Sequence, residues 1–219
     1  MAEATYRLFY SPGACSLAPH IVLEEMGVPF EPVRVVIAEG GNRTPEYLAV
    51  NPRGRVPALT WREGDREQVL TEAMAIMVWV SMRHPQIGLL PAPRTEAFVR
   101  ALEWMNWLGS TMHQAGVRTV FRPERFTTDP AGAPAIAEQG RETIRAGYAD
   151  IEQRLTGRRW ALGENFGAID AYLLVFYRWG NRCGLAMREQ FPNYARIMDE
   201  VRARHAVRRV VEREGIQID

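Results

Sequence analysis

Residues 9–17 read FYSPGACSL and determine the fold of the first part of the chain. The segment Tyr6–Tyr10 alternates in a β-prone way and stops at Ser-Pro-Gly, which is a turn signal. An apolar rhythm typical of a helix follows, at Leu17, Ile21, Leu23 and Met26. Gly27 then ends that helix. The stretch therefore predicts a strand, a tight turn and a helix in immediate succession.

The same stretch delivers a thiol, Cys15, to the first turn of the predicted helix. Unpaired backbone N–H groups and the positive end of the helix dipole stabilise an anion there. A thiolate at such a place can have a pKa well below the free value of roughly 8.5. The alternative is a small buried residue that happens to open a helix, since cysteines are often simply buried. This segment alone leaves both interpretations open.

Composition indicates a soluble globular protein with a sizeable core. The chain has 219 residues, of which 47% are hydrophobic and 24% charged, and its net charge of +1 gives no reason to expect a nucleic acid or a membrane surface as partner. Its longest apolar run, Ala171–Tyr177, is far shorter than the roughly 20 residues of a membrane span. No secretory signal is visible at the N-terminus. Cys15 and Cys183 form neither a CxxC motif nor a Cys/His metal spacing, so we expect a reducing cytoplasm and no metal.

The pattern of the chain changes near a segment rich in proline, residues 85–93. Before it, short β-rich runs alternate with helical ones, which predicts an α+β domain with one central sheet over residues 1–84. The expected elements there are strands at 6–10, 30–37, 58–61 and 67–70 and helices at 17–26, 44–50 and 72–82. After the linker, residues 94–219 are expected to form an all-helical bundle, with helices at 96–120, 133–155, 169–183 and 194–213.

A second motif of the first half lies at residues 51–59, which read NPRGRVPAL. A turn leads there into a strand that starts at Pro57, where the missing N–H is tolerated. If the peptide bond before Pro57 were cis, the Val56 backbone would be free to pair with an extended ligand. A plain trans proline in a loop is the alternative, since only about 5–6% of such bonds are cis in folded proteins.

These two motifs, with residues 70–76 reading LTEAMAI, resemble the thioredoxin-like domain of glutathione S-transferases. The all-helical second half agrees with that family. Residues 104–107 (WMNW) followed by His113, and residues 162–166 (LGENF) before 170–172 (DAY), look most like its bacterial beta class. The likeness runs from about residue 5 to residue 216.

The resemblance implies a glutathione site in the first domain. It places Cys15 at the catalytic position and implies a cis bond before Pro57, with the Val56 backbone antiparallel to the cysteinyl unit of glutathione and Arg55 beside it. Glu72 would meet the γ-glutamyl amino group, and the N–H groups opening the same helix would hold the carboxylate. Many relatives have a serine where this chain has Ala73, so one hydrogen bond worth about 0.5–1.5 kcal/mol is missing.

The helix after the linker supplies the remaining candidates. Glu103, Asn106, Ser110 and His113 fall at three- and four-residue steps on one polar face. The resemblance implies that His113 lies near the glutathione sulfur as a second catalytic residue and that Asn106 contacts the ligand. A solvated or interface histidine is the alternative. Arg43 is the nearest match to a basic group that some relatives offer.

The expected function is conjugation of glutathione, a co-substrate, to a small hydrophobic electrophile held by the helical domain. The resemblance also implies a homodimer. Two alternatives stay open: a thiol reductase or deglutathionylase in which Cys15 is the reactant, and a non-catalytic glutathione-binding carrier, which the missing serine at Ala73 favours. Replacing Cys15 with Ala and testing retention on glutathione separate the three.

Other residues have structural interpretations. Gly167 and Asp170 are expected to form a helix cap, because the aspartate can accept the N–H of Gly167. Cys183 is expected to be an inert buried thiol. His20 has no evident partner, and the basic run Arg202–Arg213 is interpreted as a solvated helix face.

Overall fold

The computed structural model describes residues 6–219, and its contacts divide the chain into two compact units. The first comprises the described residues up to Pro93 together with Arg202–Gln217. The second comprises Arg94–Val201 and Ile218–Asp219. The boundary at Pro93 coincides with the end of the proline-rich segment. The C-terminal part differs from our expectation, because we assigned all of residues 94–219 to the helical domain.

The first unit is built on a mixed four-stranded sheet in the order β2-β1-β3-β4. β1 (Tyr6–Tyr10) pairs in parallel with β2 (Phe30–Arg34), and β3 (Ala58–Glu63) pairs antiparallel with both β1 and β4 (Arg66–Thr71). All four strands lie where the sequence predicts them. β2 ends at Arg34, three residues early, because the chain turns there into the 3-10 segments η1 (Ile37–Glu39) and η2 (Gly41–Arg43).

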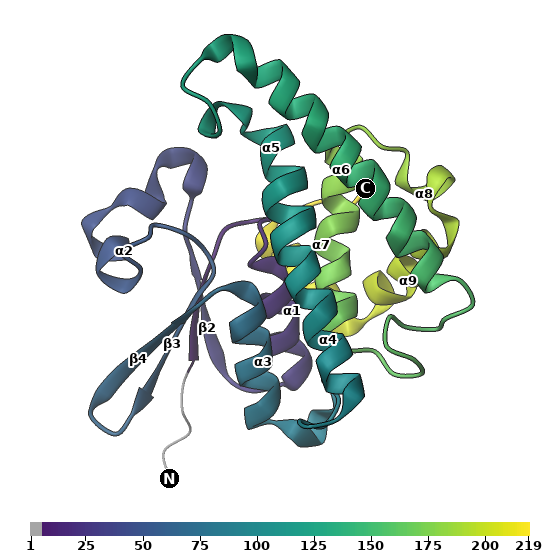
Figure 1. Cartoon of the computed structure of the whole chain (residues 1–219). Helices are drawn as coiled ribbons and strands as arrows, with labels where there is room; N and C mark the ends of the chain where they lie inside the picture. The colour runs from purple at the N-terminus through teal and green to yellow at the C-terminus, as the bar shows by residue number, and fades with distance from the viewer. Residues whose placement is uncertain (1–5) are drawn as a thin grey trace. The chain divides into compact units, whose positions relative to one another are not determined.

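Helices cover both faces of this sheet. α1 (Leu17–Met26) and α3 (Ala73–Arg83) pack on one face, and the short α2 (Pro45–Val50) lies on the other, as Figure 1 shows. The main core lies on the first face, where Leu8 and Leu59 of the strands meet apolar side chains of α1 and α3, all fully buried. On the α2 face a smaller cluster holds Phe9, Val35, Tyr47 and Ala58. A 3-10 turn, η3 (Pro85–Ile87), follows α3.

The C-terminal helix α10 (His205–Glu214) belongs to the first unit, where it packs against α1. We expected one helix over 194–213, but α9 (Pro192–Ala203) stops and Arg204 takes an extended conformation. Burial explains the break, because the apolar residues of the first turns of α9 lie in the second unit while Val207 and Val210 are buried in the first.

Ion pairs fix α10 to α1. Arg204 binds Glu25 through Nε and Nη2 at 2.5 and 2.8 Å, and both Arg209 and Arg213 bind Glu24, at 2.6 and 2.7 Å. Partial burial of Glu24 opposes its ionisation, but the bonds from Arg213 and Arg209 outweigh burial and lower the pKa of that carboxyl. The basic run is therefore a partly buried docking face, which corrects its interpretation as a solvated one.

The second unit is entirely helical. Its elements are α4 (Glu96–Trp107), the π-helix η4 (Leu108–Val117), α5 (Arg118–Phe121), the 3-10 turns η5 (Pro123–Arg125) and η6 (Pro130–Gly132), α6 (Ala133–Leu155), α7 (Ala168–Arg182), α8 (Met187–Gln190) and most of α9. The long α6 runs beside the continuous rod formed by α4, η4 and α5, as Figure 1 shows.

The middle of this rod departs from the expected α-helix over 96–120. Between Leu108 and Val117 the turns widen into a π-helix, an element that is rare at this length. The end of this π-helix and the start of α5 lie very close to α6. A Cβ on Gly140 would collide with the hydroxyl of Thr119 and lie 3.0 Å from the carbonyl oxygen of Gly116, so only glycine fits at that crossing.

The structural residues of the second unit are largely as expected. Asp170 is buried, and its two oxygens accept the N–H groups of Ala161 and Gly167, each at 2.9 Å, which confirms its capping role. Cys183 is partly exposed, which corrects the expectation of full burial, and desolvation raises its pKa to about 11. Among the described residues, none of the helices has the length and apolar character to span a bilayer.

Candidate functional site

The loop that presents Cys15 is held by a local hydrogen-bond ring. The hydroxyl of Ser16 donates to the Ser11 carbonyl and accepts the Ser11 N–H, both at 3.1 Å. Gly13 has a φ of 65°, a left-handed conformation that suits glycine. Since α1 begins at Leu17, Cys15 lies in the turn before the helix, and not in its first helical turn as we predicted.

The surroundings of Cys15 favour its neutral thiol form. Desolvation and then the nearby Glu72 carboxylate raise its pKa to about 12, although the N–H groups of Cys15 and Ser16 and the Arg55 cation act in the opposite direction. Of the two interpretations left open by the sequence, the raised pKa therefore favours the buried thiol in this state. The two N–H groups of the turn stabilise a thiolate, but they do not offset the cost of removing its charge from water. In agreement, Sγ donates to the Val56 carbonyl, 3.5 Å away.

The loop facing Cys15 contains Arg55, Val56 and Pro57. The Val56–Pro57 peptide bond is cis, which confirms what the resemblance implies. Gly54 precedes it at a φ of 59°, where a Cβ would lie 2.7 Å from the Asn42 carbonyl oxygen. The Asn42 amide in turn donates to the Gly54 carbonyl at 2.7 Å. These contacts with Asn42 fix the start of the loop. Within the loop, Val56 is half-buried and Arg55 is exposed.

Glu72 and Ala73 lie where β4 passes into α3. Glu72 occupies the N-cap with a φ of 72° and a ψ of 126°, a strained conformation for a residue with a side chain. Such strain costs about 1–3 kcal/mol and is concentrated at functional sites. Its side chain is exposed and makes no capping bond, so it is available to a ligand. Ala73, buried, opens the helix without a hydroxyl.

The structure therefore brings six predicted residues together in the first unit: Cys15, Arg55, Val56, Pro57, Glu72 and Ala73. Asn106 and His113 lie in the second unit, at the end of α4 and within η4. Asn106 is exposed and its carbonyl accepts the Ser110 hydroxyl at 2.8 Å. The half-buried His113 ring lies against Trp179 of α7, with 4.8 Å between the ring centroids.

Sequence reasoning missed a buried pair that supports the Cys15 loop. The carboxylate of Glu214, at the end of α10, accepts the Gly13 N–H at 2.7 Å through Oε2 and binds Nδ1 of His20 at 2.7 Å through Oε1. His20 and Glu214 are almost fully buried. This corrects the statement that His20 has no evident partner. No local pattern could reveal a pair separated by 194 residues.

Family comparisons agree with this geometry. The model of the glutathione S-transferase N-terminal domain matches residues 13–82, and that of the C-terminal domain matches residues 108–205. The chain is 32% identical over 215 residues to glutathione S-transferase GstA of Escherichia coli O157:H7, with 96% of this chain and 100% of that protein covered.

Solved structures give the same result. A glutathione transferase homologue from Sulfitobacter, crystallised with bound glutathione, superposes with a TM-score of 0.87 at 32% identity, covering 97% of this chain and 99% of that one. A bacterial beta class glutathione S-transferase from Sphingomonas chungbukensis gives 0.80 at 31% identity, covering 96% and 100%.

The fold and these matches together define a glutathione-dependent transferase with an N-terminal thioredoxin-like domain. The chain belongs to the glutathione S-transferase family, and the likeness to its bacterial beta class is confirmed. Among the described residues, no group of three or more His, Cys, Asp or Glu side chains is arranged to hold a metal.

Proposed function

We propose that the protein conjugates glutathione to small hydrophobic electrophiles, with the tripeptide bound along the Arg55–Pro57 loop of the first unit. The observation that carries this proposal is the meeting of the Cys15 thiol, the Val56 backbone beside a cis proline, and the strained Glu72. Val56 would pair with the cysteinyl backbone of glutathione, and Glu72 with its γ-glutamyl ammonium group. The N–H groups opening α3 would donate hydrogen bonds to its carboxylate.

In the proposed reaction the glutathione thiol loses its proton and its sulfur forms a bond to the electrophilic carbon. With an aryl halide the carbon–halogen bond breaks and halide leaves. Positioning of the thiol supplies part of the rate. Cys15, as a neutral donor, is suited to hydrogen-bond to the glutathione thiolate and so to favour its ionisation. We assign His113 a second stabilising role and Asn106 a ligand contact, both from the second unit, which would also hold the electrophile.

A direct test combines binding and turnover. Calorimetry with glutathione should give saturable binding, and 1-chloro-2,4-dinitrobenzene should be conjugated with release of chloride. Glu72→Gln keeps the shape but removes the charge, and should weaken glutathione binding about tenfold or more, as expected for a lost charged hydrogen bond. Glu67→Gln, an exposed acid on the neighbouring strand, is the matched control. Absence of glutathione binding at millimolar concentration would refute the proposal.

The thiol reductase alternative requires Cys15 as an attacking thiolate. A pKa of about 12 leaves almost none of it ionised at neutral pH, which counts against this route in the free protein. Cys15→Ala should therefore slow conjugation without abolishing it, while any disulfide reduction disappears. We further propose that the protein works as a homodimer in the cytoplasm, which light scattering of the purified chain and cell fractionation would test.

A further inference from the structure

The carbonyl of Arg55 is the most strongly bound group in the candidate glutathione loop. It accepts the Tyr47 hydroxyl and the Asn51 side-chain amide, each at 2.6 Å. Tyr47 is in α2 and Asn51 directly follows that helix, so both bonds come from the same short element. Both donors are buried, with 5% and 2% of their surface exposed.

Peptide planarity passes this restraint on to Val56. The Arg55 carbonyl and the Val56 N–H belong to one planar trans peptide unit and point in opposite directions. Holding the carbonyl towards α2 therefore directs the Val56 N–H away from it. On the other side of the Val56 α-carbon, the carbonyl accepts the Cys15 thiol. Within residues 6–219 the Val56 N–H has no recorded acceptor, so it stays available to a ligand.

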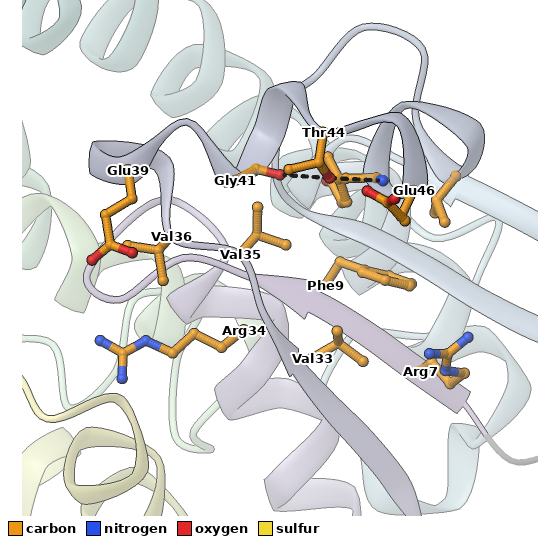
Figure 2. Close-up of a pocket in the computed structure, with 12 residues that line it drawn as sticks. Arg7, Phe9, Val33, Arg34, Val35, Val36, Glu39, Gly41, Thr44 and Glu46 are labelled. Atoms are coloured by element: carbon orange, nitrogen blue, oxygen red, sulfur yellow. Dashed lines mark hydrogen bonds between the residues drawn. The ribbon is translucent and has the colours of Figure 1, made fainter.

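Tyr47 also packs in the apolar cluster of the α2 face. The Tyr47 ring lies 5.7 Å from that of Phe9. A cavity of about 570 Å³, drawn in Figure 2, also opens between α2 and the sheet and is lined by Tyr47, Val50, Val33 and Val35. Apolar contacts hold the ring in place, and the two hydrogen bonds add the direction that such contacts lack. Burial raises the pKa of Tyr47 to about 12, which keeps its hydroxyl a donor at neutral pH.

We propose that Tyr47 and Asn51 are positioning residues for glutathione, which act by holding the Arg55 carbonyl so that the Val56 N–H faces the ligand. The proposal rests on the function proposed above, since it assumes that glutathione pairs with Val56. Neither side chain is assigned a contact with substrate. They orient the peptide unit that makes that contact.

The first test is Tyr47→Phe, which removes one hydroxyl and keeps the ring. KM and the calorimetric Kd for glutathione should rise about three- to tenfold, the loss expected for one hydrogen bond. The kcat at saturating glutathione should stay within about twofold, because the reacting groups are untouched. Asn51→Ala should give a similar effect. In the double variant, the rise in KM for glutathione should be smaller than the product of the two single-variant rises, because both residues act on one carbonyl.

A matched control is Tyr148→Phe in the second unit. That hydroxyl also donates to a carbonyl, of Phe176 at 2.7 Å, and is fully buried. The control should lose stability to a similar degree while KM for glutathione stays unchanged. If Tyr47→Phe and Tyr148→Phe both leave KM unchanged while the parent protein binds glutathione, the positioning proposal is wrong. If the parent protein binds no glutathione, the function itself is wrong.

Discussion

Cys15 combines a reactive group with surroundings that keep it neutral. The thiol is desolvated, lies near Glu72 and donates to the Val56 carbonyl, so its proton is held in the free protein. A thiol in that state is a hydrogen-bond donor and a poor nucleophile. At the scale of this residue, these surroundings favour the proposed role of Cys15 as a hydrogen-bond donor to the sulfur of glutathione.

Alkylation tests this state of Cys15. In a Cys183→Ala background, iodoacetamide should react slowly with Cys15 at pH 7, and the rate should still be rising at pH 10, because the pKa is raised to about 12. A rate that levels off near neutral pH would show a thiolate and would contradict this prediction. Free cysteine under the same conditions is the reference.

The same shift makes a prediction for stability. The folded state raises the pKa of Cys15 from about 9 to about 12 and so holds its proton more tightly than the unfolded chain. The stabilisation is complete below pH 9 and is lost as the pH rises towards 12. Between pH 9 and pH 12 the unfolding free energy of the parent protein should therefore fall relative to that of Cys15→Ala. A difference independent of pH from 7 to 11 would contradict this.

At the scale of elements, the crossing of α6 with the α4–η4–α5 rod organises the second unit. Gly140 allows the approach, and Thr119 turns its hydroxyl to the Ala115 and Gly116 carbonyls at 2.8 and 2.7 Å. His113 lies on the same rod, three residues before Gly116. A distortion at this crossing would thus be transmitted to the segment that carries His113.

Gly140→Ala should lower the unfolding free energy by about 1–3 kcal/mol, the usual cost of overpacking, because a backbone oxygen lies 3.0 Å from the new methyl group. Thermal or urea unfolding measures it. Gly109→Ala is the control, since a Cβ there meets only the Tyr172 hydroxyl at 3.6 Å, an ordinary contact. Equal stability of the two variants would contradict the close-packing argument.

At the scale of the whole molecule, the end of the chain supports a loop near its beginning. Glu214 joins Gly13 and His20 in a buried set of bonds, and three arginines of the C-terminal segment pair with Glu24 and Glu25. Removing one member of a buried hydrogen-bonded set is costly because it leaves a buried polar group without that bond.

Glu214→Ala should lower the unfolding free energy by about 1–3 kcal/mol, the cost of leaving a buried polar group without its bond, and should weaken glutathione binding because the Gly13 N–H loses the Glu214 carboxylate. Thermal unfolding and calorimetry measure the two effects. Glu212→Ala, two residues earlier and exposed, should change neither. A normal melting temperature for Glu214→Ala would show that the buried bonds contribute little.

Local patterns predicted most of the fold, and the family resemblance supplied most of the candidate site residues in the first unit. Strand alternation, turn residues and helical periodicity placed the sheet and α6 almost to the residue, and the family resemblance implied the cis bond before Pro57. Periodicity missed the π-helical turns around His113, because nothing in the residue pattern requires the widened hydrogen bonds. The Glu214–His20 pair and the separate docking of α10 depend on distant contacts, which spacing does not record.

The attachment of α10 to α1 makes the first unit discontinuous in the chain. Glu214 must be synthesised before the acceptor of the Gly13 N–H is present, so this unit completes its fold only after residues 94–201 of the second unit have been made. Proteolytic cleavage after Pro93 would for the same reason yield a fragment that lacks part of its own core. The fold thus makes the Cys15 loop depend on a segment that is synthesised after the second unit.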